Sequence, residues 1–172
     1  MRKLPILIVL LTSSAAMADE PNPISSTVKG SYERVKKFII GAADQMPAAD
    51  YAYKPTPEVR SFGQLIGHLA DANYMFCSAA KHEKLAPKNI EKTVTTRDAL
   101  KKSLAEAFAY CDAVYAASTD ATLKEAAELP FMKTSKFGAL DINVAHDNEH
   151  YGNIVTYLRL KKIVPVSSQG RE

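Results

Sequence analysis

Ser61-Phe62-Gly63-Gln64-Leu65-Ile66-Gly67-His68-Leu69 is the stretch that decides the fold of this chain. Ser61 and Gln64 match a helix capping box, in which each side chain accepts a hydrogen bond from a backbone N–H group of the other residue. The apolar residues that follow recur at helical spacing to about Lys81, which predicts a helix of about 30 Å that contains His68.

Three further segments have the same helical spacing, and no segment of comparable length alternates apolar with polar residues. They run from about Ser26 to Met46, from Thr95 to about Ala117, and from near Gly138 to a point before Pro165. Residues 51–60 contain two prolines and are expected to form an extended connector. Four amphipathic helices without strands predict an all-α fold, a four-helix bundle.

The N-terminus has the three-part layout of a secretory signal peptide, which we assign to residues 1–18. Met1-Arg2-Lys3 is basic, Leu4 to Leu11 is apolar, and Ala16-Met17-Ala18 offers a cleavage site. The apolar run is shorter than the roughly 20 residues that span a bilayer, so we expect no stable membrane anchor after cleavage. The remaining residues 19–172 are expected to form one domain in the bacterial periplasm.

The charge of the mature chain is nearly balanced. Removal of Arg2 and Lys3 from 22 basic residues leaves 20, against 19 acidic residues. Proteins that bind nucleic acid usually carry a clustered basic surface. We therefore expect no nucleic-acid partner, whereas a small-molecule substrate and a homodimer are both compatible with the sequence.

The sequence His146-Asp147-Asn148-Glu149-His150 places two imidazoles four residues apart. On a helix they leave the same face, about 40° apart and one turn along, so both can reach one ion at about 2.0–2.1 Å. Asn153 and Tyr157 project from the same face, and we expect them beside the ion as orienting groups. The spacing alone favours the alternatives, a chance pair or a hydrogen-bonded pair in the core, over a metal site.

His68 strengthens the metal hypothesis. A lone histidine on an inner helix face is usually a hydrogen-bonded core residue, but three of the four histidines here fall on inner faces of two helices. Buried imidazoles without partners cost free energy, and one shared ion satisfies all three. We therefore predict one divalent ion on His68, His146 and His150. Imidazole suits zinc, nickel, copper and iron, and manganese is a further candidate.

His82 is the fourth histidine and cannot share this ion. It lies about 21 Å from His68 along the axis of the same helix. We expect it on the surface near the C-terminus of that helix, where a cation is mildly favoured.

The string His146-x-x-Glu149-His150 also matches the inverted zinc-protease pattern H-x-x-E-H. That interpretation requires a further protein ligand, typically a carboxylate well downstream, and only 22 residues follow His150. Glu149 also lies about 60° from His146, at the edge of the metal face. We set proteolysis aside and keep Glu149 only as a subsidiary candidate for a catalytic base.

Cys77 and Cys111 are the only cysteines. An oxidising compartment favours a disulfide between them, which would stabilise the fold by roughly 3–4 kcal/mol through chain entropy. The alternative is two buried free thiols. Cys77 lies about 180° around the helix from His68, so it is a poor candidate for the same metal site.

Two segments resemble the DinB-like proteins. Residues 53–55 and 60–69 are similar to the start of the second helix in that family, and residues 146–165 are similar to its fourth helix. The resemblance implies a four-helix bundle with a divalent ion on a histidine triad. One ligand comes from helix two and two come from an H-x-x-x-H pair in helix four, at the positions of His68, His146 and His150.

The resemblance also implies two kinds of chemistry, because some relatives use low-molecular-weight thiols and others are described as metal-dependent hydrolases. It does not imply DNA binding. The signal peptide and the cysteine pair depart from the cytosolic members, which places thiol transfer in doubt.

We therefore hypothesise a metal-dependent enzyme, a hydrolase or transferase acting on a small molecule, because three histidines leave an ion with an open position. The alternative is a non-catalytic metal-binding or stress-related structural domain. An open channel to the ion favours catalysis, and a sealed site favours a structural role.

Overall fold

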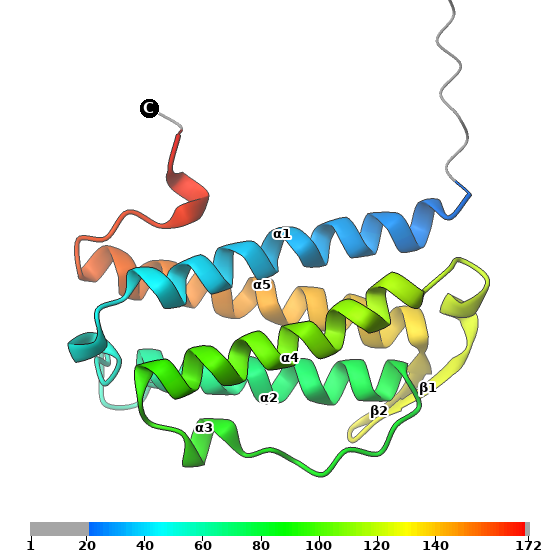
Figure 1. Ribbon diagram of the computed structural model, residues 1–172, viewed down its shortest axis with the longest axis horizontal. Helices are drawn as coiled ribbons and strands as arrows, with labels where there is room; N and C mark the ends of the chain where they lie inside the picture. Colours follow the sequence, from blue (N-terminus) through cyan, green and yellow to red (C-terminus); the bar gives the residue numbers. More distant parts are fainter. Residues whose placement is uncertain (1–20, 171–172) are drawn as a thin grey trace, which may run out of the picture.

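The structure, a computed structural model, describes residues 21–170 and consists mainly of four long helices (Figure 1). They are α1 (Pro23–Gln45), α2 (Phe62–Ala80), α4 (Arg97–Ala117) and α5 (Lys136–Leu160). Each covers one of the segments predicted from apolar spacing, so the predicted all-α four-helix bundle is confirmed. The predicted signal peptide lies outside the described residues.

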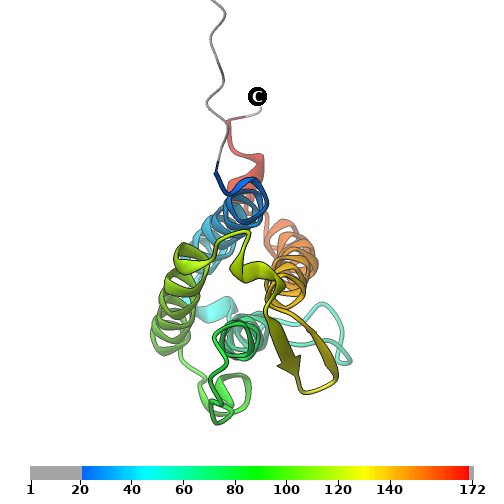
Figure 2. The same cartoon turned by 90° about the vertical axis from the view of Figure 1, so that its right-hand side faces the viewer.

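The helices pack as a bundle in which α2 contacts both α4 and α5, and α1 contacts the same two helices from the other side (Figure 2). Figure 1 shows that α2 and α4 run in one direction and that α1 and α5 run in the other. The connection between α2 and α4 therefore runs back along the length of the bundle. This crossover, residues 81–96, contains the short helix α3 (Ile90–Thr93) and lies against α2.

The core is a continuous apolar cluster between the four helices. Its largest members are at most 1% exposed and include Tyr32, Ile39, Phe62, Ile66, Leu69, Phe108, Leu140 and Ile154. The buried residues of α5 recur every three or four positions, which is the spacing of the inner seam of a helical bundle. Cys77 of α2 and Cys111 of α4 form a disulfide, with their Cα atoms 5.4 Å apart.

The prediction that the chain has no strands is wrong at one place. β1 (Ala126–Leu129) and β2 (Met132–Ser135) pair as an antiparallel hairpin between α4 and α5. Strands of four residues are too short to be recognised by alternation over a longer window, although β1 does alternate exposed with buried residues.

The helix boundaries also shift by a few residues for local reasons. The side chain of Ser135 accepts a hydrogen bond from the backbone N–H of Gly138, so α5 begins at Lys136 rather than near Gly138. α1 begins at Pro23, three residues before the predicted start, because proline is well tolerated in the first helical turn.

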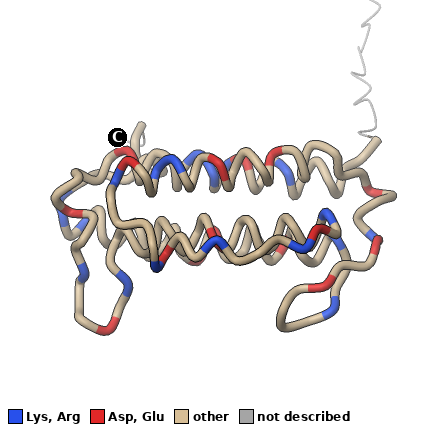
Figure 3. The backbone as a smooth tube through the Cα atoms, turned by 60° about the horizontal axis from the view of Figure 1, so that its bottom comes forward, with Lys and Arg blue, Asp and Glu red and all other residues tan. Residues whose placement is uncertain are grey.

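Charges of both signs are interspersed along the long helices (Figure 3). Several form ion pairs between elements, such as Lys36 with Asp112 at 2.6 Å and Lys161 with Asp50 at 2.8 Å. Within residues 21–170, no helix combines the length and the apolar character needed to cross a bilayer.

Candidate metal centre

The three histidines predicted to share an ion lie together between α2 and α5. Their ring centroids are 5.0 Å apart for His68 and His146, 4.7 Å for His68 and His150, and 4.4 Å for His146 and His150. One ring nitrogen from each lies within 4.8 Å of the other two. His150 is buried, and the other two are half-buried. The three side chains could therefore hold one metal ion.

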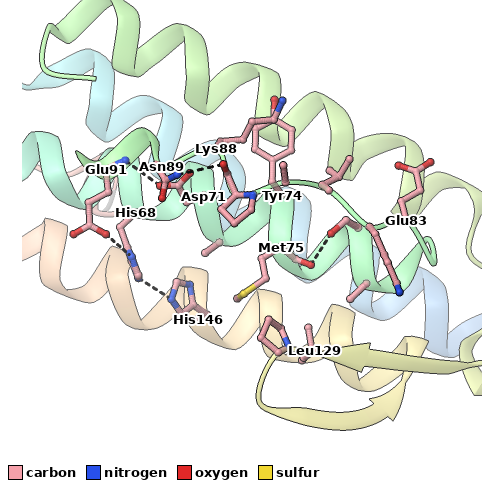
Figure 4. Close-up of a pocket in the computed structure, with 18 of the residues that line it drawn as sticks. His68, Asp71, Tyr74, Met75, Glu83, Lys88, Asn89, Glu91, Leu129 and His146 are labelled. Atoms are coloured by element: carbon pink, nitrogen blue, oxygen red, sulfur yellow. Dashed lines mark hydrogen bonds and ion pairs between the residues drawn. The ribbon is translucent and has the colours of Figure 1, made fainter. Parts of the chain in front are cut away.

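The distance between His68 and His146 fits two ligands of one ion. Their Nε2 atoms are 3.1 Å apart (Figure 4). Two nitrogens bound to one ion at about 2.05 Å, with an angle of about 90–110° at the metal, are about 2.9–3.4 Å apart. Nδ1 of His146 is buried and has no hydrogen-bond partner among the described residues, so Nε2 is the nitrogen that this ring presents to its neighbours.

Glu91 determines which nitrogen of His68 faces the site. Oε2 of Glu91 lies 3.0 Å from Nδ1 of His68, and its Oε1 accepts a hydrogen bond from Nε of Arg60 at 2.9 Å. A carboxylate only accepts hydrogen bonds, so Nδ1 carries the proton and Nε2 keeps a free lone pair. A carboxylate behind a histidine is the usual way in which proteins orient a metal-binding imidazole.

The sequence of α2 explains how Glu91 reaches His68. The carboxylate of Asp71 accepts hydrogen bonds from the backbone N–H groups of Ile90 and Glu91, both at 2.9 Å. Gly67 permits the close approach, because a Cβ atom there would lie only 2.7 Å from Cα of Glu91. Gly67, His68 and Asp71 thus dock α3 on α2.

The surroundings of His146 and His150 favour their neutral forms. Burial, together with the charges of His150 and His68, lowers the pKa of His146 to about 4. Burial and the charge of His68 also lower the pKa of His150. Burial opposes ionisation of Glu91, but the hydrogen bond and charge of Arg60 and the charge of His68 hold its pKa below the usual value. Neutral imidazoles beside an ionised carboxylate are suitable metal ligands and partners.

A large cavity opens directly beside the histidines. It measures about 750 Å³ and is lined by His68, His146, the outer face of α2, the crossover and the hairpin. Figure 4 shows His68 and His146 at one end of it and Glu83 at the other. A small molecule of ordinary size can enter a cavity of this volume.

A second polar cluster lies deeper between the same two helices. Nδ2 of Asn73 donates to Oδ1 of Asp147 at 3.0 Å, and Nδ2 of Asn143 donates to Oδ1 of Asn73 at 3.1 Å. All three side chains are fully buried. Burial raises the pKa of Asp147 to about 8, although the hydrogen bond from Asn73 opposes the change. We call these three residues the sealed cluster, and the three histidines the open cluster.

The other residues named from the sequence lie around the site. Nδ2 of Asn153 is 3.5 Å from Nδ1 of His150, and Glu149 is exposed. The hydroxyl of Tyr157 donates to the backbone carbonyl of Arg60 at 2.6 Å, so it holds the residue that pairs with Glu91. His82 is exposed just after α2, as expected.

Sequence reasoning missed Glu91 and Asp147. Glu91 lies 23 residues after His68, in a segment without helical periodicity, so only the folded crossover brings it to the site. Asp147 had a usable signal, because it falls on the inner seam of α5 between Asn143 and His150.

Comparison with known proteins identifies the family and the fold. The family model of the DinB superfamily matches residues 32–154. The chain belongs to the DinB superfamily. No protein among the curated sequences matches this chain.

Three solved structures have a similar fold. A DinB-like protein from Bacillus cereus is 13% identical, with a TM-score of 0.70, and the match covers 81% of this chain and 94% of that one. A DinB-like protein from Bacillus subtilis is 22% identical, with a TM-score of 0.66 and coverage of 86% and 99%. A conserved protein from Enterococcus faecalis is 16% identical, with a TM-score of 0.64 and coverage of 79% and 95%. At these identities the likeness concerns the fold.

Proposed function

We propose that His68, His146 and His150 bind one divalent metal ion, and that this DinB superfamily member is a metal-dependent enzyme acting on a small molecule. The observation that carries the proposal is the pair of Nε2 atoms 3.1 Å apart, with Nδ1 of His68 committed to Glu91. Two imidazole nitrogens at this distance repel each other unless a proton or a cation lies between the two nitrogens. A divalent ion supplies Lewis acidity, which activates a water, a thiol or a substrate oxygen.

The residues of the chain have separate tasks in this proposal. Glu91 keeps the proton of His68 on Nδ1, which leaves the Nε2 lone pair of this ring for the ion, and burial keeps His146 neutral, as a metal ligand must be. Tyr157 holds Arg60, which in turn orients Glu91. Asn153 lies next to His150 and is a candidate to orient that ring or a bound substrate.

Access to the cluster supports catalysis over a purely structural role. A structural ion is usually enclosed by four protein ligands, whereas three histidines leave an open coordination position. Here His68 and His146 both line a cavity, so a molecule in the cavity could reach an ion held by the histidines. Hydrolysis fits an oxidising compartment better than transfer to a reduced thiol. Zinc, nickel, iron and manganese are the candidate ions.

Metal analysis of protein purified without a histidine tag tests the proposal. We expect about one divalent ion per chain in the wild type, and an ion content near zero in His150→Ala. His82→Ala is the matched control, because this histidine is exposed and remote, and it should keep the full ion content. Equal ion contents in His150→Ala and the wild type would reject the site. A substrate screen at full ion occupancy, with His150→Ala as the blank, then tests for catalysis.

We also propose that the protein is exported to the periplasm. Two features support this: the signal-peptide pattern of residues 1–18 and the disulfide between Cys77 and Cys111. Fractionation of bacteria expressing the full chain should yield a periplasmic protein whose N-terminus is Asp19. A cytoplasmic protein that retains Arg2 and Lys3 would contradict export and leave the metal proposal intact.

A further inference from the structure

The cavity beside the histidines has three walls of different origin. One is the outer face of α2, the second is the crossover between residues 83 and 92, and the third is the hairpin turn at residues 128–130. Figure 4 shows Met75 and Leu129 between the histidine end and the Glu83 end. A ligand that reaches the histidines therefore passes along these middle residues.

The middle of the cavity is apolar. Ala72, Met75 and Ala79 line it from α2, and Leu85, Leu129 and Pro130 line it from the crossover and the hairpin. Met75 is half-buried, and its flexible thioether packs against the edge of the core and lines the cavity. Such a wall favours an aliphatic or aromatic body, and a methionine adapts to its shape.

Three of the four carboxylates that line the cavity are already engaged by the protein. Asp71 accepts two backbone hydrogen bonds from α3, and Glu91 binds His68 and Arg60. Glu83 binds Nζ of Lys81 at 2.6 Å and the hydroxyl of Tyr110 at 2.7 Å. Within residues 21–170, the carboxylate of Glu128 has neither an ion pair nor a hydrogen bond, and Asp71 has no ion pair.

The lysines that line the cavity are not neutralised in this way. Lys84, Lys88 and Lys92 make no ion pair in the part of the chain that the structure describes. Nζ of Lys88 lies 5.2 Å from the centre of the Tyr74 ring, which keeps this ammonium at the cavity. The two carboxylates without a cationic partner, Asp71 and Glu128, lie on α2 and the hairpin, so the three ammonium groups give the crossover side of the cavity a positive charge.

We propose that the cavity binds a small amphipathic anion. Its apolar body lies between Met75 and Leu129, and its carboxylate, sulfonate or phosphate group faces Lys84, Lys88 and Lys92. Where the ligand is also the substrate, its reacting group lies at His68 and His146, and this last assignment rests on the proposed function. Anion binding itself does not, because the lysines and the apolar wall are independent of an ion.

Calorimetry on the full mature protein, with the metal removed by chelation, tests the charge preference. The probes are octanoate and octylammonium, which share one chain and differ in the sign of the head group. Octanoate should bind at least about fivefold more tightly, as expected from roughly 1 kcal/mol of charge interaction at a partly exposed site. Removing the ion beforehand ensures that octanoate cannot bind through it.

A matched pair of triple variants locates the charge. Lys84→Gln, Lys88→Gln and Lys92→Gln together should abolish the preference for octanoate. Lys37→Gln, Lys54→Gln and Lys102→Gln remove the same charge from exposed positions that do not line the cavity, and should preserve it. Equal binding of the two probes by the wild type, or equal losses in the two triple variants, would overturn the proposal.

Methyl NMR of methionine-labelled protein locates the apolar body. Octanoate should shift the Met75 signal and leave the signal of Met46, which is fully buried in the core, unchanged. A shift of Met46 without Met75 would overturn the placement. A preference for octanoate in a protein that takes up no metal would refute only the enzyme proposal. A protein with one ion per chain and no such preference would refute only the ligand class.

Discussion

α2 and α5 carry two polar clusters that lie close together and have opposite surroundings. The sealed cluster of Asn73, Asn143 and Asp147 is fully buried, whereas two members of the open cluster line a cavity of about 750 Å³. His146 and Asp147 are neighbours in the sequence, yet they belong to different clusters. Successive residues of a helix point about 100° apart, so one faces the cavity and the other the core.

The two clusters differ in how their polar atoms are satisfied. The sealed cluster is held by hydrogen bonds between its own side chains and to Tyr115, although Oδ1 of Asn143 and Oδ2 of Asp147 have no partner among the described residues. The disulfide lies beside it, with Sγ of Cys111 3.3 Å from the backbone oxygen of Asn73. The open cluster presents ring nitrogens to one another at the edge of the cavity, where an ion from outside the chain could bridge them. A polar group inside a bundle therefore indicates binding only where free lone pairs meet a cavity.

The largest effect on stability is expected from removal of the disulfide, which lies beside the sealed cluster. Cys77→Ala with Cys111→Ala should lower the free energy of unfolding by about 3–4 kcal/mol, because the bridge spans 34 residues and restricts the unfolded chain. Urea denaturation measures this. Ion content should stay unchanged in the folded variant, and its loss there would show that the two clusters are not separate.

Asn143→Ala tests the sealed cluster itself. The variant leaves Oδ1 of Asn73 without its donor in the core, which should cost about 2–3 kcal/mol of unfolding free energy. Asn153→Ala is the control on the same helix, since Asn153 is exposed, and it should change stability by less than about 0.5 kcal/mol. Equal losses in urea denaturation would contradict the assignment of a sealed cluster.

Glu91→Gln tests the orientation of the open cluster. An amide cannot hold the proton of His68 on Nδ1 as a carboxylate does, so the affinity for the metal should fall about 10–100-fold. Competition with a chromophoric chelator measures the affinity. Glu128→Gln makes the same change of charge on the cavity wall and should leave the affinity within a factor of about two of the wild type. Similar losses in both variants would show a general effect of charge.

The smallest effect is expected at the far end of the cavity. Hydrogen bonds from Lys81 and Tyr110 lower the pKa of Glu83, so this carboxylate stabilises the fold above its unfolded pKa, and the contribution is lost as the pH falls through the folded value. Glu83→Gln should lower the melting temperature slightly at pH 7, and the difference should narrow below pH about 4.5. If the difference in melting temperature between the wild type and Glu83→Gln grew as the pH fell, the lowered pKa of Glu83 would be contradicted.

Long elements could be predicted from the sequence, and short ones could not. The four long helices were predictable because their apolar spacing repeats over several turns, and the histidines because they fall on those faces. α3 and the two strands have four residues each, which is too short for a period to show. Glu91 was not predictable, since its position depends on the docking of the crossover through Gly67 and Asp71.

X-ray absorption spectroscopy of the wild-type protein loaded with one equivalent of zinc tests the central claim most directly. Three imidazole nitrogens at about 2.0–2.1 Å are predicted in the first shell, and His150→Ala should lose one of them or the ion. A first shell with fewer than three imidazoles in the wild type, or one that contains sulfur, would contradict the convergence of His68, His146 and His150 on a single ion.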